Sequence, residues 1–111
     1  MPSKFLLQEK DIRERLDNVI DPELGISIVK LGLIYKISLT EKDNKQYLHI
    51  LMTLTTPGCP LAGVFDAMVR DSLYGLPDLD IDQNVRIELT FDPPWVPDMM
   101  DPEAKAELGF D

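Results

Sequence analysis

The chain has 111 residues, 44% of them apolar and 28% charged, and its net charge is −9. This composition predicts a single globular domain over residues 1–111 and excludes a disordered, collagen-like or disulfide-rich chain. The acidic excess lies in the second half, where three positive side chains face twelve negative ones. Phosphates and anionic lipids are bound by clustered lysine and arginine, so neither nucleic acid nor a membrane is an expected partner. Without a membrane-length apolar run or a signal-type leader, the expected location is cytoplasmic.

The first expected element is an amphipathic helix over residues 8–19. Apolar side chains recur there at helical spacing, and charged side chains occupy the other side. Pro22 disfavours helical backbone at Asp21, so the helix is expected to stop there and to lead into a loop over residues 21–25.

A hairpin of two strands is expected next. Apolar side chains occupy every second position over residues 33–40 and again over residues 47–54, which is the period of a strand with one drier face. Asp43 and Asn44 lie between the two runs and are turn-forming residues. The two strands are therefore expected to pair antiparallel.

A second helix and a third strand follow. Apolar side chains recur at helical spacing over residues 61–73, and Gly75 and Pro77 then end the helix. Residues 85–91 alternate again as a strand. Because this strand is reached through a helix, it is expected to lie parallel to the second strand of the hairpin.

The C-terminal part is expected to leave the sheet. Three prolines within residues 92–97 lack the N–H group that a strand ladder needs. Trp95 in this segment is expected either to pack over the edge of the core or to belong to a lid or interaction loop. Asp101 is a candidate N-cap, with Pro102 at the first position of a short helix that Gly109 ends.

The predicted order is helix, strand, strand, helix, strand, helix. It indicates an α+β fold, a small two-layer sandwich in which helices pack against a three-stranded mixed sheet. The sheet is expected to consist of the hairpin and one strand parallel to the second strand of the hairpin.

The single cysteine, Cys59, precedes Pro60 at the expected start of the second helix. Since proline favours the first helical position, Cys59 is expected at the N-cap. Free N–H groups and the helix dipole stabilise an anion there and lower the pKa of a thiol, and a thiolate is both a nucleophile and a soft-metal ligand. Gly58 favours an accessible site. The alternative is a buried cysteine that fills a gap in the core.

The other residues exclude several kinds of thiol chemistry. His49 is expected in the middle of a strand, roughly 30 Å of extended chain from Cys59, so a hydrolase pair is not expected. We interpret His49 as an outward-facing strand residue without a catalytic part. A second cysteine for disulfide exchange is lacking, and the nitrogen and sulfur ligands are too few for structural zinc. A metal or cluster at Cys59 would need ligands from elsewhere.

Two acidic features each have two interpretations. Asp21 and Glu23, on either side of Pro22, would supply hard metal ligands, or Asp21 would cap a local turn. Residues 92–111 carry six carboxylates against Lys105. That segment is either a solvated tail or a docking site for a basic partner.

Four segments occur in a characteristic order and spacing along the chain. They are DPE at residues 21–23, SIVKLGLIY at 27–35, MTLTTPGCP at 52–60 and LTFDPPW at 89–95. Together they resemble the SufT/PaaD-type iron-sulfur assembly domain family, over nearly the whole chain. The extra C-terminal cysteines of the PaaD branch are lacking, which favours the shorter SufT-like branch.

This resemblance implies a non-enzymatic accessory factor for the assembly of iron-sulfur clusters or their transfer to client proteins. It places the reactive cysteine of the family at Cys59, the acidic motif at Asp21 and Glu23, and the threonines before the cysteine at Thr55 and Thr56. Cys59 would be the metal ligand for a transient cluster or iron shared with another chain. The implied partners are iron-sulfur assembly proteins and apo client proteins. The sequence has no phosphate-binding loop for a nucleotide.

The leading hypothesis is cluster assembly or transfer through Cys59. A [2Fe–2S] cluster needs four ligands, so either the two subunits of a homodimer share it with external thiols or Cys59 is only a handover point. The alternative is a metal-free docking adaptor that recruits assembly machinery through the acidic C-terminal half and the Trp95 loop. Thiol-dependent hydrolysis or redox catalysis is not expected, since the sequence offers Cys59 neither a base nor a resolving cysteine.

Overall fold

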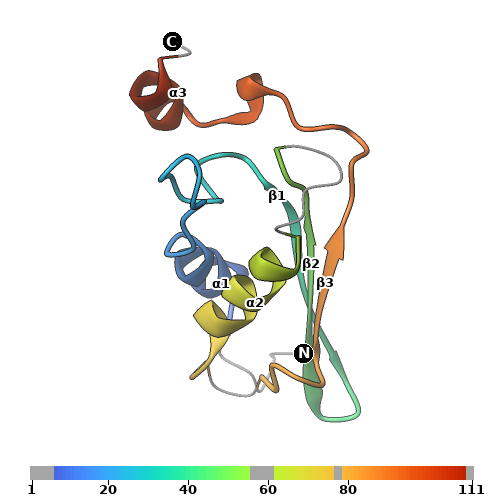
Figure 1. Ribbon diagram of the computed structural model, residues 1–111. Coiled ribbons are helices and arrows are strands. Elements are labelled where there is room, and N and C mark those ends of the chain that lie inside the picture. Colours follow the sequence, from blue (N-terminus) through green and yellow to red (C-terminus); the bar gives the residue numbers. More distant parts are fainter. Residues whose placement is uncertain (1–6, 56–61, 77–78, 110–111) are drawn as a thin grey trace.

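The computed structural model describes residues 7–55, 62–76 and 79–109 (Figure 1). Its elements in chain order are α1 (Glu9–Leu16), β1 (Ile34–Lys42), β2 (Lys45–Met52), α2 (Ala62–Leu73), β3 (Val85–Leu89), the 3-10 helix η1 (Pro97–Met99) and α3 (Pro102–Leu108). The α+β fold and the order of its helices and strands agree with the sequence-based prediction. In the described part of the chain, no helix is long and apolar enough to cross a membrane.

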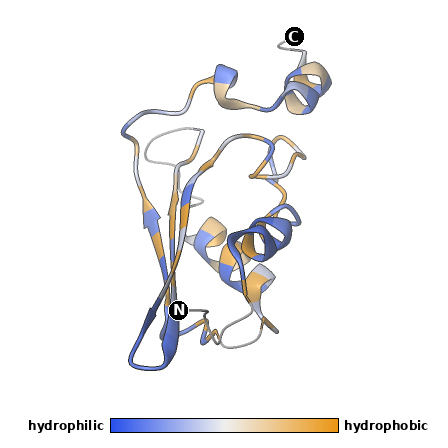
Figure 2. Ribbon diagram, turned by 180° about the vertical axis from the view of Figure 1, so that it is seen from behind, coloured by the Kyte–Doolittle hydropathy of each residue, from blue (hydrophilic) through white to orange (hydrophobic). Residues whose placement is uncertain are grey.

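The sheet has the order β1-β2-β3, with β1 antiparallel to β2 and β3 parallel to β2. Both pairings confirm the prediction. The turn of the hairpin is made by Asp43 and Asn44, whose φ angles of 54° and 64° suit the tight turns that match the twist of paired strands. Figures 1 and 2 show α1 and α2 on the same face of the sheet, and hydrophilic residues at the hairpin end.

The core lies between this pair of helices and the sheet. Its fully buried members include Ile12 and Leu16 of α1, Leu48, Ile50 and Met52 of β2, and Val69 and Leu73 of α2. Burying each such side chain stabilises the fold by about 1.5–3 kcal/mol. The alternation predicted for residues 47–54 therefore identified the buried face of β2 correctly.

Two elements are shorter than the sequence predicts. The first helix ends at Leu16 instead of residue 19, because the N–H groups of Asn18 and Val19 bond carbonyls three residues back and tighten the last turn. The third strand ends at Leu89 instead of residue 91. The N–H of Asp92 donates a 3.2 Å hydrogen bond to the hydroxyl of Thr90, and this local turn replaces the hydrogen bonds of the strand ladder.

An irregular segment over residues 26–33 contributes to the core without being a helix or a strand. Its buried apolar side chains are Ile26, Ile28, Leu31 and Leu33. It is anchored at both ends, because the N–H of Ile28 bonds the carbonyl of Val19 and the N–H of Thr53 bonds the carbonyl of Leu33. These bonds connect the segment to the turn after α1 and to the residue after β2.

The C-terminal segment leaves β3 and crosses the end of the sheet, so that η1 and α3 lie over the irregular segment (Figure 1). The side chain of Asp101 accepts a 2.8 Å bond from the N–H of Ala104, and Gly109 ends α3 with φ 82°. Both residues act as predicted. Met100 and Ala104 are buried, which anchors the segment to the core.

Candidate functional site

Asp21 organises the acidic loop. It is buried, and its Oδ1 accepts hydrogen bonds from the N–H groups of Glu23 and Leu24, at 2.8 and 3.1 Å. Its backbone N–H bonds Ile26, and its carbonyl accepts from Gly25, at 2.9 and 2.8 Å. The structure thus confirms the local capping role, and the carboxylate that the sequence offered as a metal ligand is engaged in shaping the turn.

The remaining predicted site residues lie in different surroundings. Glu23 is exposed on the same loop as Asp21, and Thr55 is half-buried three residues after the end of β2. Among the described residues, no hydrogen bond or ion pair joins Thr55 to this acidic loop. Thr56 and Cys59 fall outside the described residues, and so does the predicted N-cap position of Cys59. The described part of α2 begins at Ala62.

Two of the four motif segments contact each other. The indole N–H of Trp95 donates a 2.7 Å bond to the carbonyl of Leu31, and the hydroxyl of Tyr35 donates a 2.8 Å bond to the carbonyl of Pro93. Trp95 also packs against the core, which confirms one of its two predicted roles. Residues 27–35 and 89–95 therefore form one surface, with the C-terminal segment fastened across it.

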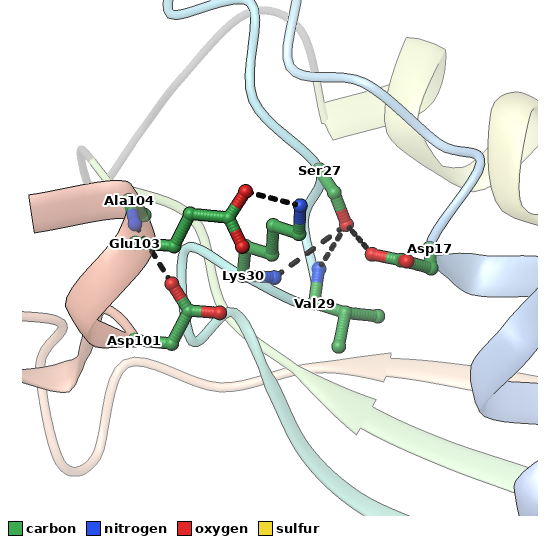
Figure 3. Close-up of polar contacts among 7 residues, drawn as sticks. All are labelled: Asp17, Ser27, Val29, Lys30, Asp101, Glu103 and Ala104. Carbon is green, nitrogen blue, oxygen red and sulfur yellow. Dashed lines mark hydrogen bonds and ion pairs between the residues drawn. The ribbon is translucent and has the colours of Figure 1, made fainter. Parts of the chain in front are cut away.

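A polar cluster continues this contact (Figure 3). The Ser27 hydroxyl donates a 2.5 Å bond to Oδ1 of Asp17 and accepts the N–H of Val29 at 3.1 Å. The ammonium of Lys30 lies 3.3 Å from Oε1 of Glu103, and the Lys30 carbonyl accepts the N–H of Asp101 at 2.9 Å. This cluster joins the end of α1, the irregular segment and α3.

No sequence pattern predicted a role for Ser27 or Lys30 in this cluster. Ser27 and Lys30 lie inside the second motif, but the periodicities of helix and strand are both absent there, so nothing in the pattern indicated which side chains point inward. The hydrogen bond to Glu103 and the charge of Glu103 raise the pKa of Lys30 above its ordinary value of 10.5. The positive charge that anchors α3 therefore persists at every physiological pH.

His49 lies in the middle of β2, as predicted. Its Nε2 atom is 2.9 Å from Oε1 of Glu88 on β3, and its side chain is about a third exposed. Since carboxylates that orient histidines occur in many structural settings, this pair alone points to no reaction. The interpretation that His49 has no catalytic part stays a prediction.

Among the described residues, no group of three or more histidine, cysteine, aspartate or glutamate side chains is arranged to hold a metal ion. A polar hollow of about 640 Å³ opens at the hairpin end of the sheet, between residues 44–47 and residues 80–84. The motif residues Met52 and Leu89 end β2 and β3 at the opposite end of these strands. The hollow is therefore remote from the surface that the motifs form.

Known proteins resemble this chain over most of its length. The Fe-S protein maturation auxiliary factor YitW of Bacillus subtilis is 39% identical and covers 92% of this chain and 94% of its own. The Fe-S protein maturation auxiliary factor SufT of Staphylococcus aureus is 41% identical over 82% of this chain and 97% of its own. A solved domain of unknown function from Bacillus anthracis superposes with a TM-score of 0.80 at 35% identity, covering 93% of this chain and 92% of that one.

A family model described as iron-sulfur cluster assembly protein matches residues 9–87, from the first helix into the third strand. The matched region contains the acidic loop, the irregular segment and the cysteine motif. Together with relatives that are about 40% identical over most of their length, this match is specific. The chain therefore belongs to the iron-sulfur cluster assembly protein family.

Proposed function

We propose that this chain is a non-enzymatic accessory factor that passes iron-sulfur clusters, or iron, to apo client proteins through the thiol of Cys59. The observation that carries the proposal is family membership combined with one cysteine in the whole sequence, in a Gly-Cys-Pro string before α2. Relatives described as maturation auxiliary factors support it. In this proposal the cluster is cargo, which the chain holds only for a short time.

The number of available ligands explains why the binding is transient. A cluster of the [2Fe–2S] type has four ligand positions, usually filled by thiolates, and this chain supplies one thiol. The missing ligands come from the assembly protein, the client or a second copy. A site that always lacks ligands releases its cargo readily, as a transfer factor requires.

The two acidic residues of the loop have different parts in this proposal. Asp21 is buried and accepts two backbone hydrogen bonds, so it holds the loop in shape. Glu23 is exposed, and its carboxylate is accessible to iron or to a basic side chain of a partner. Thus Asp21 acts as a positioning residue and Glu23 as the contacting one.

The alternative adaptor, which docks through acidic C-terminal residues, is less well supported. Asp101 caps α3, Glu103 pairs with Lys30, and Asp98 lies 3.3 Å from Lys105. Of these contacts, the Glu103–Lys30 pair attaches the C-terminal segment to the rest of the fold, and those of Asp98 and Asp101 stabilise the segment itself. Reversing the charges of these carboxylates would therefore disturb the segment or its attachment as well as any docking.

Anaerobic transfer to a purified apo client tests the proposal. The wild-type chain and Cys59→Ser are incubated with iron and sulfide, desalted and mixed with an apo ferredoxin, and cluster formation is followed by visible absorption. We expect wild type to deliver at most about one cluster per loaded assembly and Cys59→Ser to deliver none above background. Equal delivery by both proteins would overturn the role of the thiol. Repeated delivery when iron and sulfide are kept in excess, above the rate of a sample without the chain, would overturn the non-enzymatic assignment.

A further inference from the structure

Strand β3 is an edge strand of the sheet. The order β1-β2-β3 leaves it with a single neighbour, and Figure 1 shows it at the side of the molecule. An edge strand presents backbone N–H and C=O groups with which another strand could pair. Its five residues are Val85, Arg86, Ile87, Glu88 and Leu89.

Two hydrogen bonds establish which backbone groups point outward. The N–H of Leu48 bonds the carbonyl of Asn84, and the N–H of Thr90 bonds the carbonyl of Met52, both at 2.9 Å. The even-numbered residues of β3 therefore direct their backbone groups at β2. Since these directions alternate along a strand, Val85, Ile87 and Leu89 direct theirs away from the sheet.

Those outward groups are almost unused in the described part of the chain. The carbonyl of Val85 accepts the guanidinium of Arg70 at 3.2 Å and keeps a second lone pair. The side chain of Leu89 is 38% exposed, although it occupies the same face as the buried Met52. This edge of the sheet thus combines unpaired backbone N–H and C=O groups with the exposed apolar side chain of Leu89.

The sequence of β3 is complementary to itself when reversed. In an antiparallel pair centred on Ile87, Arg86 lies opposite Glu88 of the second strand, and Glu88 lies opposite its Arg86. Val85 lies opposite Leu89, so apolar residues also meet apolar ones. Opposite charges on directly facing residues stabilise an antiparallel pair, whereas like charges destabilise it.

We propose that β3 pairs antiparallel with β3 of a second copy of this chain, about a two-fold axis at Ile87. The outward groups of Val85, Ile87 and Leu89 fall in hydrogen-bonded positions, because all three carry both groups on the free side. Arg86 and Glu88 fall in the closer positions between them, where facing side chains approach best. Both copies thus contribute the same strand to a two-fold symmetric interface that leaves no further site for pairing. The two three-stranded sheets join into a single six-stranded sheet.

Charged residues on a short edge strand usually prevent such pairing. Here their spacing has the opposite effect, because positions 86 and 88 are equidistant from Ile87 and carry opposite charges. Arg86 and Glu88 of one chain lie 3.5 Å apart, so the approaching strand meets an alternating pair of charges. These charges therefore disfavour pairing with unrelated strands and favour antiparallel pairing with β3 of a second copy.

The dimer goes beyond the proposed function and does not create a shared cluster site, because β2 is parallel to β3 and the C-terminal ends of the two β2 strands therefore point in opposite directions. Its existence does not depend on that function. The test is therefore run on the Cys59→Ser background and in the absence of metal, so that failure of the dimer and failure of the thiol chemistry are separate results.

Sedimentation equilibrium over a range from micromolar to about 1 mM chain measures the dissociation constant. We expect reversible dimers, weakened about tenfold by Arg86→Glu and by Glu88→Arg, which place like charges opposite each other twice per dimer. The double variant Arg86→Glu/Glu88→Arg should restore the wild-type constant within about threefold. The matched control is Lys36→Glu, the same charge change on β1, and it should leave the constant unchanged.

Amide hydrogen exchange locates the interface without any substitution. Exchange at Ile87 and Leu89 should slow at least threefold between dilute and concentrated protein, while the inward N–H groups of Arg86 and Glu88 should change less. A chain that stays monomeric at 1 mM would overturn the proposal. So would a dimer that Arg86→Glu and Glu88→Arg leave intact, or one that the double variant fails to restore.

Discussion

The indole N–H of Trp95 reaches the carbonyl oxygen of Leu31 at 2.7 Å, across 64 residues of sequence. This bond fastens the C-terminal segment to the irregular segment that fills the end of the core. Tyr35 adds a second bond of the same kind, to the carbonyl of Pro93. The motif-bearing surface is thus held by side chains that satisfy backbone carbonyls, and its stability can be tested bond by bond.

Replacing Trp95 with phenylalanine should lower the free energy of unfolding by about 1–3 kcal/mol. The reason is that Leu31 is fully buried, and its carbonyl would lose its hydrogen-bond donor. Urea unfolding followed by circular dichroism measures the change. The control is Val96→Ala, at a side chain that is 45% exposed, and it should cost far less. Equal losses in the two variants would mean that the bond is unimportant.

Gly32→Ala should release the C-terminal segment. A Cβ atom at Gly32 would lie 2.2 Å from the carbonyl oxygen of Met99, and the φ of +80° is unfavourable for alanine. Gly25→Ala is the matched control, because its φ of +69° carries a similar strain with open space around the new atom. We expect Gly32→Ala to cost at least about 2 kcal/mol more than the control. Urea unfolding and the fluorescence of Trp95 measure the effect, and equal costs would contradict it.

Substitutions at Asp21 and at Glu23 should have different effects, the first on stability and the second on cluster delivery. Asp21→Ala should lower the free energy of unfolding by about 1–3 kcal/mol, since two backbone N–H groups lose their acceptor. Asp21→Asn keeps an oxygen in place and should cost clearly less. Glu23→Gln, at an exposed position, should leave stability within about 0.5 kcal/mol and reduce cluster delivery. Normal delivery by Glu23→Gln would exclude its carboxylate from the contact with cargo or partner.

The pair of Lys30 and Glu103 makes a prediction about pH. The hydrogen bond and the charge of Glu103 raise the pKa of Lys30 above 10.5, so the stability that they contribute is fully present below pH 10.5. It is lost as the pH rises through the higher pKa of the folded protein. An NMR titration of the Lys30 side chain should therefore show a lower pKa in Glu103→Gln than in wild type. An identical pKa in both proteins would show that the pair does not form in solution.

Most of the regular fold was predictable because its signals are local. The alternation over residues 47–54 identified a strand with one buried face, and Asp101 with Pro102 marked the start of α3. The parallel placement of β3 followed from the helix that connects it to β2. Each of these inferences depends on backbone geometry or side-chain period within a few residues of sequence.

What could not be predicted depends on contacts between distant residues. The irregular segment over residues 26–33 is buried without a helical or strand period, so its core residues had no recognisable pattern. The docking of Trp95 on Leu31 and of Glu103 on Lys30 requires the folded positions of both partners. The sequence suggested Asp21 as a capping residue or a ligand, and only the hydrogen bonds of the folded loop showed that it caps the turn.

In the proposed function, the Cys59 thiol is the group through which this chain passes iron or clusters to client proteins. The most direct measurement is the activity of an iron-sulfur client enzyme, per amount of client protein, in cells that lack the chain and express either wild type or Cys59→Ser at equal abundance. We predict that wild type restores the activity and that Cys59→Ser leaves it at the level of cells without the chain. Full restoration by Cys59→Ser would show that delivery to clients does not require this thiol.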